Sequence, residues 1–232
     1  MSGYYFIGLL ALIIAGFWPS YFVKFFNGTA DFSFYFHFHA ATMLLWVFAL
    51  ILQPILVKKK KLPLHRLIGK TSYALFPLIV ISAVLMVHLS HNHDTEEKNL
   101  DLTLFAQFKD FILFAIAYCI AIRYRHNVAV HARAMIATGI ALIEPALARL
   151  FYNSLSGFQL FSNIPPFGNV MAILVIYLLL TGLIILERQQ KRGRWVFPLI
   201  LGIFFIFNIP ALFQIHIGLR AFSKWFVALH IT

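Results

Sequence analysis

The chain has 232 residues, of which 61% are hydrophobic and only 12% are charged. Soluble domains carry about 25% charged residues because their cores need a polar shell, so this composition excludes a water-soluble globular fold and favours a protein surrounded by lipid. The net charge of +11 is carried mainly by short basic clusters between apolar runs, which is typical of membrane topology signals and argues against a nucleic-acid partner.

Seven apolar segments follow one another along the chain, and each has close to the roughly 20 residues that an α-helix needs to cross a bilayer. In chain order they cover residues 4–25, 35–57, 64–89, 102–122, 131–152, 170–186 and 195–217. The first segment has neither a basic leader nor a small-residue cleavage site, so we expect a retained helix rather than a signal peptide. The sequence therefore predicts an all-α, polytopic membrane helix bundle in which residues 1–232 form a single integral membrane domain.

Basic residues cluster after the second, fourth and sixth of these segments. They are Lys58–Lys61, Arg66 and Lys70, then Arg123, Arg125 and Arg133, then Arg188, Lys191, Arg192 and Arg194. Since loops rich in Lys and Arg stay on the cytoplasmic side, the N-terminus is predicted to be cytoplasmic and the C-terminus external. The loops at residues 27–33, 91–101 and 154–168 are then external, and the basic loops are expected to contact anionic lipid headgroups.

Residues 218–232 are too few to cross the membrane again. Arg220 and Lys224 lie four residues apart, with Trp225 and Phe226 beside them. Basic and aromatic side chains in this combination are typical of helices that lie in the membrane interface. We expect a short interfacial helix here, and a frayed terminus is the alternative.

Two prolines are expected to distort the predicted helices. Pro145 cannot donate a hydrogen bond to the carbonyl of Ala141, and Pro210 has the same effect in the last segment, so a kink is predicted at each. Both prolines lie in the outer half of their segments. Kinked helices with polar residues at the same depth often surround a cavity.

Ionisable and amide side chains gather at the depth of these prolines, although a charged group costs on the order of 3 kcal/mol to place inside a membrane. The candidates are Asp110, Glu144, Arg149 and Asn208, with Lys109 beside Asp110. Two interpretations stay open. One is an ion cluster that holds helices together, and the other is a site that binds protons or a small ligand.

Three histidines stand at predicted helix ends. His39 opens the second segment and lies on the same helical face as Gln53, whereas His65 and His131 open the third and fifth segments at matched depth near the cytoplasmic surface. Neutral imidazole is a common ligand of haem iron, zinc and copper. A haem b or a transition metal held by His65 and His131 is therefore predicted, with His39 as the ligand of an outer centre. A packing or interfacial role is the alternative for each ring.

Arginines accompany the two inner histidines. Arg66 follows His65 directly and Arg133 follows His131 by two residues, so either is expected to pair with haem propionates. A separate external group is expected to form a solvated loop, or alternatively a weak zinc or copper site. It consists of His88, His91, His93, Asp94, Glu96 and Glu97.

The order and spacing of several of these residues resemble a known family. The elements are His39, Gln53-Pro54, Lys58–Lys61 and the run Leu64-His65-Arg66-Leu67-Ile68-Gly69-Lys70, followed by His131, Met135 and Arg149. Over residues 35–153 the pattern resembles the bacterial membrane-protein family called domain of unknown function 2306. The resemblance implies an integral protein of the bacterial inner membrane and supplies no reaction. Lys70 departs from the family's usual Arg, and Arg133 stands where the family tends to be acidic.

Three functions remain open on the sequence. The first is a haem- or metal-binding redox protein that uses the histidines at helix ends. The second is a protein that binds or transports a small ligand or protons through a polar cavity in the outer leaflet. The third is an accessory subunit of a membrane complex, or a homo-oligomer. The residues identify no catalytic group, so enzymatic activity stays open as well.

Overall fold

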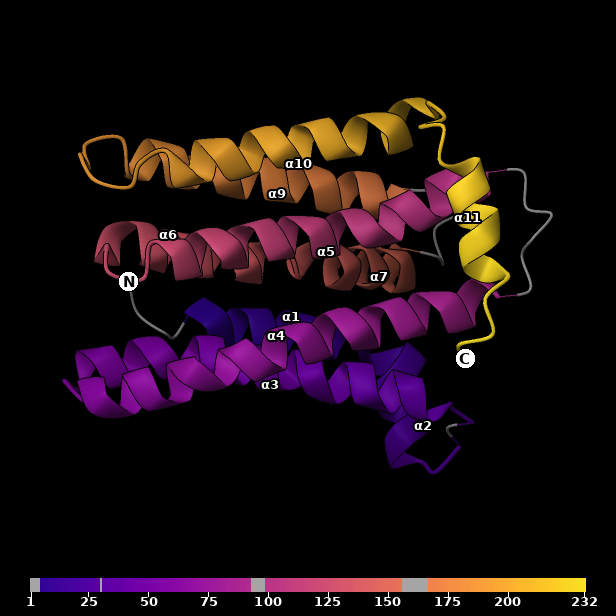
Figure 1. Ribbon diagram of the computed structural model, residues 1–232, viewed down its shortest axis with the longest axis horizontal. Coiled ribbons are helices and arrows are strands. Elements are labelled where there is room, and N and C mark those ends of the chain that lie inside the picture. Colours follow the sequence, from indigo (N-terminus) through magenta and orange to yellow (C-terminus); the bar gives the residue numbers. More distant parts are fainter. Residues whose placement is uncertain (1–4, 30, 93–98, 156–166) are drawn as a thin grey trace. The chain divides into compact units, whose positions relative to one another are not determined.

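A computed structural model describes residues 5–29, 31–92, 99–155 and 167–232 (Figure 1). Over these ranges the secondary structure is helical, without a strand. Seven helical stretches are long and apolar enough to cross a membrane. They are Tyr5–Phe26, Phe34–Lys58, Leu62–His91, Leu100–Arg123, Val128–Ser154, Gly168–Leu186 and Val196–Phe213. The predicted all-α, polytopic architecture is confirmed, and the chain is an integral membrane protein.

The helices differ from the predicted segments chiefly at their ends and at two interruptions. Their bounds are α1 Tyr5–Phe17, the π-helical turn η1 Trp18–Phe22, α2 Val23–Phe26, α3 Phe34–Lys58, α4 Leu62–His91, α5 Leu100–Arg123, α6 Val128–Ile140, α7 Ile143–Leu155, α9 Phe167–Leu186, α10 Val196–Phe213 and α11 Arg220–Val227. The predicted short helix near the C-terminus is therefore present as α11.

The helices group into two compact units. The first unit comprises residues 31–111 and 206–232, and the second comprises residues 5–30 and 112–205. In the first unit α3 packs along the length of α4, and α11 contacts α4 as well. In the second unit α7 packs against both α1 and α9. Helices α5 and α10 are each divided between the units. Residues 100–111 of α5 and 206–213 of α10 belong to the first unit, and the remainder of each helix belongs to the second.

Small residues set the close packing of the second unit. A Cβ atom at Gly16 of α1 would overlap the carbonyl group of Ala146 in α7. A Cβ atom at Gly168 of α9 would lie 2.7 Å from the carbonyl oxygen of Ala148. Because lipid supplies no hydrophobic driving force between membrane helices, close backbone approach over small residues is a main source of their packing energy.

The kink predicted at Pro145 takes the form of a break between α6 and α7. Ala141 and Leu142 form a turn, in which the Leu142 N–H donates to the carbonyl oxygen of Gly139 at 3.2 Å. The break lies one turn before Pro145, where the proline removes the hydrogen bond to the Ala141 carbonyl. Pro210, by contrast, lies inside a helix that continues to Phe213.

The last membrane span is shorter than predicted. We expected it to extend to Ile217, but α10 ends at Phe213. Gln214 has a φ of +54° and Gly218 a φ of +74°, so the backbone enters the left-handed region and cannot continue a right-handed helix. This turn leads into α11, whose buried Phe226 and Val227 pack with Val87 of α4 and with Leu100 and Leu104 of α5.

Candidate functional site

His88 lies in the interior of the first unit beneath α11. Its side chain is 0% exposed, its Nδ1 atom lies 2.6 Å from the hydroxyl oxygen of Thr232, and its ring packs edge-on against Phe226 with centroids 5.3 Å apart. The expectation that His88 belongs to a solvated loop is wrong. Helix α11 and the C-terminal residue Thr232 pack against α4 and cover the His88 ring. His93, Asp94, Glu96 and Glu97 lie outside the described residues.

Asp101 and His216 join the start of α5 to the connection between α10 and α11. The Asp101 side chain is 2% exposed, whereas that of His216 is 58% exposed. The Nδ1 atom of His216 lies 3.3 Å and 3.4 Å from the two carboxylate oxygens of Asp101. Since a carboxylate only accepts hydrogen bonds, Nδ1 is the donor. An exposed, titratable ring is thus hydrogen-bonded to a buried acid.

Two further polar pairs in the same unit involve side chains of α5. The side-chain amide of Gln107 lies 2.5 Å from the Nε2 atom of His91, and the Nζ atom of Lys109 donates to Asp110 at 2.8 Å. Lys109 is 2% exposed although it carries a charge. Asn208 of α10 is fully buried as well. The first unit therefore holds Asp110 and Asn208 from the predicted outer group.

Glu144 and Arg149 fall in the second unit. Glu144 is buried on α7. Arg149 is exposed, donates to the carbonyl oxygen of Pro145 at 3.1 Å, and lies with its guanidinium 4.6 Å from the ring centroid of Phe17. A cation over an aromatic face at this distance is attracted by the ring's quadrupole. The predicted group of four is thus divided between the units, and its assembly into one site stays a prediction.

His39 takes part in hydrogen bonding between α3 and α4. Its Nδ1 atom lies 3.1 Å from the hydroxyl of Ser82, which in turn lies 3.1 Å from the hydroxyl of Thr42. The His39 ring also packs edge-on against Phe111. His39 therefore faces the neighbouring helix, and its role as a metal ligand stays a prediction.

Gln53 and His65 form a second link between α3 and α4. With its nitrogen turned toward His65, the Gln53 amide donates to the His65 carbonyl oxygen at 3.2 Å and to the ring Nδ1 atom, and its oxygen accepts from the Gly69 N–H at 3.0 Å. Because Nδ1 then accepts, the proton of the neutral His65 ring is on Nε2. The role of His65 as a metal ligand stays a prediction. Arg66 is exposed.

In the second unit, the Nδ1 atom of His131 donates a hydrogen bond, whereas that of His65 accepts one. The His131 Nδ1 atom lies 2.9 Å from the carbonyl oxygen of Ala121. A carbonyl cannot donate, so Nδ1 carries a proton, and in the neutral ring Nε2 would be the nitrogen with the lone pair. Metal-binding histidines are commonly oriented by such a bond. Because His65 belongs to the first unit and His131 to the second, a site shared by the two stays a prediction.

Arg133 is held by Glu187 and by its own helix. Its Nε atom lies 2.5 Å from the carboxylate of Glu187, and one terminal nitrogen donates to the Ala129 carbonyl at 2.8 Å. Gly193, with a φ of +74°, lies close: a Cβ atom there would be 3.1 Å from the Arg133 guanidinium. The Arg133 guanidinium thus already has an acid partner, Glu187. The sequence did not indicate this ion pair, and the expected pairing of Arg133 with a haem propionate stays a prediction.

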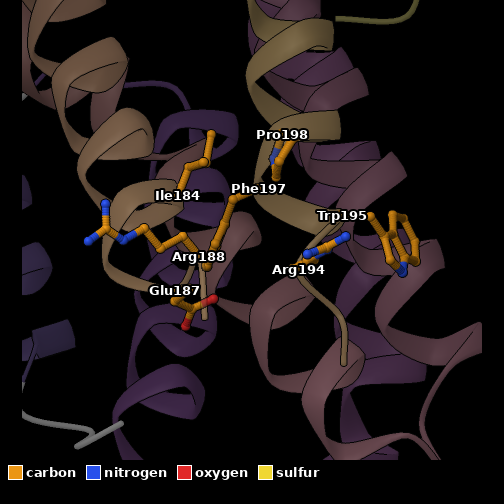
Figure 2. Close-up of a pocket in the computed structure, with 7 residues that line it drawn as sticks. All are labelled: Ile184, Glu187, Arg188, Arg194, Trp195, Phe197 and Pro198. Atoms are coloured by element: carbon orange, nitrogen blue, oxygen red, sulfur yellow. The ribbon is translucent and has the colours of Figure 1, made fainter. Parts of the chain in front are cut away.

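Within the ranges that the structure describes, three or more His, Cys, Asp or Glu side chains nowhere converge as a metal site would require. Two cavities open at the basic end of the second unit. One of about 320 Å³ lies between the end of α9 and the start of α10 (Figure 2), and one of about 530 Å³ is lined by residues 126–129 and Arg192.

Comparisons of the chain with protein-family models, with curated proteins and with solved structures found no match. The resemblance over residues 35–153 stays a prediction.

Proposed function

We propose that this integral membrane protein binds and transfers protons at the α11 end of its first unit. The observation that carries the proposal is the hydrogen bond between the buried carboxylate of Asp101 and the exposed ring of His216. Histidine is the side chain whose charge changes near neutral pH, and here its ring connects the surroundings to a buried acid.

The proposed transfer uses the two nitrogens of the His216 ring. Nε2 takes a proton from hydronium, which leaves water, and the proton on Nδ1 passes to the Asp101 carboxylate. The ring is then neutral with its proton on Nε2, and the carboxyl group is neutral as well. Ionisable groups inside membrane proteins are costly to place, so they are retained mostly where they act. The same unit also buries the side chains of Lys109 and His88.

Purified protein in liposomes with an internal pH-sensitive dye tests this proposal. A potassium diffusion potential should drive proton entry, and Asp101→Asn should lower the rate at least about tenfold. Asp31→Asn is the matched control, because Asp31 is an exposed acid of the same unit. Equal rates in the wild type and in Asp101→Asn would exclude Asp101 as a carrier of protons.

A second measurement detects proton binding without transport. The infrared difference spectrum between acidic and alkaline samples should contain the carbonyl band of a protonated carboxylic acid. The component of that band that belongs to Asp101 should be missing from Asp101→Asn and present in Asp31→Asn. If neither flux nor band depends on Asp101, the Asp101–His216 pair has a structural role only.

Haem or metal binding at His131 is a second proposal. Its support is the Nδ1 hydrogen bond to the Ala121 carbonyl, which leaves Nε2 of the neutral ring as the nitrogen that could bind a metal. Purified protein should then show a Soret band that shifts on dithionite reduction, or a bound metal in elemental analysis, and His131→Ala should lose it. A folded preparation without colour or metal would remove this proposal.

A further inference from the structure

The cavity between α9 and α10 combines two arginines with an apolar interior. Its lining comes from the end of α9 and the turn after it, and from the residues at the start of α10: Ile184, Glu187, Arg188, Arg194, Trp195, Phe197 and Pro198. Figure 2 shows Arg188 on the α9 side, and Arg194 and Trp195 on the α10 side. Phe197 is 1% exposed and Ile184 is partly buried, so the interior is hydrocarbon.

The acidic side chain in the lining of this cavity does not neutralise its two arginines. Glu187 is its only acid, and the carboxylate of Glu187 is bound to Arg133. In the described part of the chain, neither the Arg188 nor the Arg194 guanidinium has a hydrogen bond or an ion pair. Each guanidinium carries five N–H donors in a planar fork that fits the oxygens of a phosphate. The cavity therefore offers N–H donors that would fit an anion with several acceptor oxygens.

The surroundings of the cavity favour an anion that carries hydrocarbon. Trp195 is 40% exposed and packs edge-on against Tyr124, and aromatic residues of this kind mark the membrane–water interface. Leu186 on α9 and Leu199 on α10 continue this surface as exposed apolar side chains. Acyl chains attached to a phosphate held at the cavity would lie along these two helices.

We propose that this cavity binds the headgroup of an anionic phospholipid, with Arg188 and Arg194 contacting its phosphate oxygens. Lys191 and Arg192, in the turn between the two arginines, add positive charge. Basic pockets between membrane helices bind lipid headgroups in this way, and excess positive charge favours a lipid with net negative charge over a zwitterionic one. The binding is independent of any proton transfer at Asp101.

Native mass spectrometry of the full chain with added lipid tests the assignment. Phosphatidylglycerol should bind at least about tenfold more tightly than phosphatidylcholine. The double variant Arg188→Gln/Arg194→Gln should lose most of that preference, because each charged hydrogen bond is worth on the order of tenfold in affinity. Lys59→Gln/Lys61→Gln removes the same charge from exposed positions that do not line the cavity and should leave affinity within about twofold.

Three outcomes would overturn the proposal. They are equal binding of the two lipids, binding of inorganic phosphate as tight as that of phosphatidylglycerol, and loss of lipid binding in Arg192→Gln but not in the double variant. The last would place the lipid in the neighbouring cavity that Arg192 lines. If the double variant does not fold, Arg194→Lys replaces it. This variant keeps the charge but loses the fork, so a severalfold loss is expected, and unchanged affinity would count against the site.

Discussion

Gly16 of α1 lies directly against the backbone carbonyl of Ala146 in α7, at a distance that leaves no room for a side chain. We predict that Gly16→Ala forces the two helices apart and destabilises the protein by about 1–3 kcal/mol, the usual range for overpacking. Thermal unfolding of the purified variant in detergent measures the effect.

The control for this prediction lies on the same helix. A Cβ atom at Gly8 meets no atom within 4 Å. Gly8→Ala should therefore leave the unfolding midpoint unchanged or raise it slightly, since alanine has the higher helix propensity. Equal destabilisation by both variants would mean that close packing at Gly16 is not the cause.

The pair of Arg133 and Glu187 should contribute strongly to stability. The two side chains are only 10% and 15% exposed, so Arg133→Gln leaves a carboxylate without its cation in a largely desolvated place. We predict a loss of about 3 kcal/mol, the lower end of the range for a broken buried ion pair. Lys59→Gln removes an exposed positive charge and should stay within about 0.5 kcal/mol.

A double-mutant cycle separates the pair from its surroundings. The variant Arg133→Gln/Glu187→Gln should be more stable than the sum of the two single losses predicts, because it leaves no uncompensated charge. Strict additivity of the two single effects would show that the two groups do not interact in the membrane.

Phe226 should hold α11 on the first unit. It is 5% exposed and contacts the rings of His88 and Phe108, whereas Phe222 on the same helix is 47% exposed. Phe226→Ala removes a buried aromatic ring, a change that typically costs about 3–5 kcal/mol. Hydrogen exchange across residues 220–227 should then accelerate in Phe226→Ala and remain slow in Phe222→Ala. Exchange that is slow in both would mean that other contacts dock α11.

Cysteine labelling checks the membrane orientation that the basic loops predict. In a variant with Cys119→Ala, cysteines at Asn27 and Asn92 should react with an impermeant maleimide in intact cells. Cysteines at Lys60 and Gln190 should react only after the membrane is opened. Labelling of Lys60 from outside would reverse the predicted orientation.

Hydropathy was sufficient to locate all seven membrane spans, because each span must satisfy its backbone internally and be apolar over its length. The details that it missed depend on the backbone. The π-helical turn at Trp18–Phe22 contains Pro19, which we did not single out. The early end of α10 depends on the left-handed conformation of Gln214, and hydropathy carries no information on φ.

The candidate site was predictable only where its residues are close in the sequence. Lys109 and Asp110 are adjacent in the sequence, so their ion pair could be expected from the sequence alone. The burial of His88 depends on Thr232 and Phe226, more than a hundred residues away in the chain. Arg133 and Glu187 are likewise far apart, and helical periodicity relates side chains within one helix but not between helices. For the same reason, the sequence placed residue 101 only at the end of the predicted external loop 91–101 and did not indicate its partner His216.

The break between α6 and α7 also explains how the membrane tolerates Glu144. Because α7 begins at Ile143, Glu144 lies in the first turn of a helix, where backbone N–H groups have no partner inside the helix. The aligned peptide dipoles place roughly half a positive charge at this end, which stabilises a nearby carboxylate by about 0.3–1 kcal/mol, and by about 2 kcal/mol when it is partly buried. In an unbroken span Glu144 would stand in mid-helix without this field. The break thus gives one membrane span two helix dipoles, those of α6 and α7, and the positive end of the α7 dipole lies beside the Glu144 carboxylate.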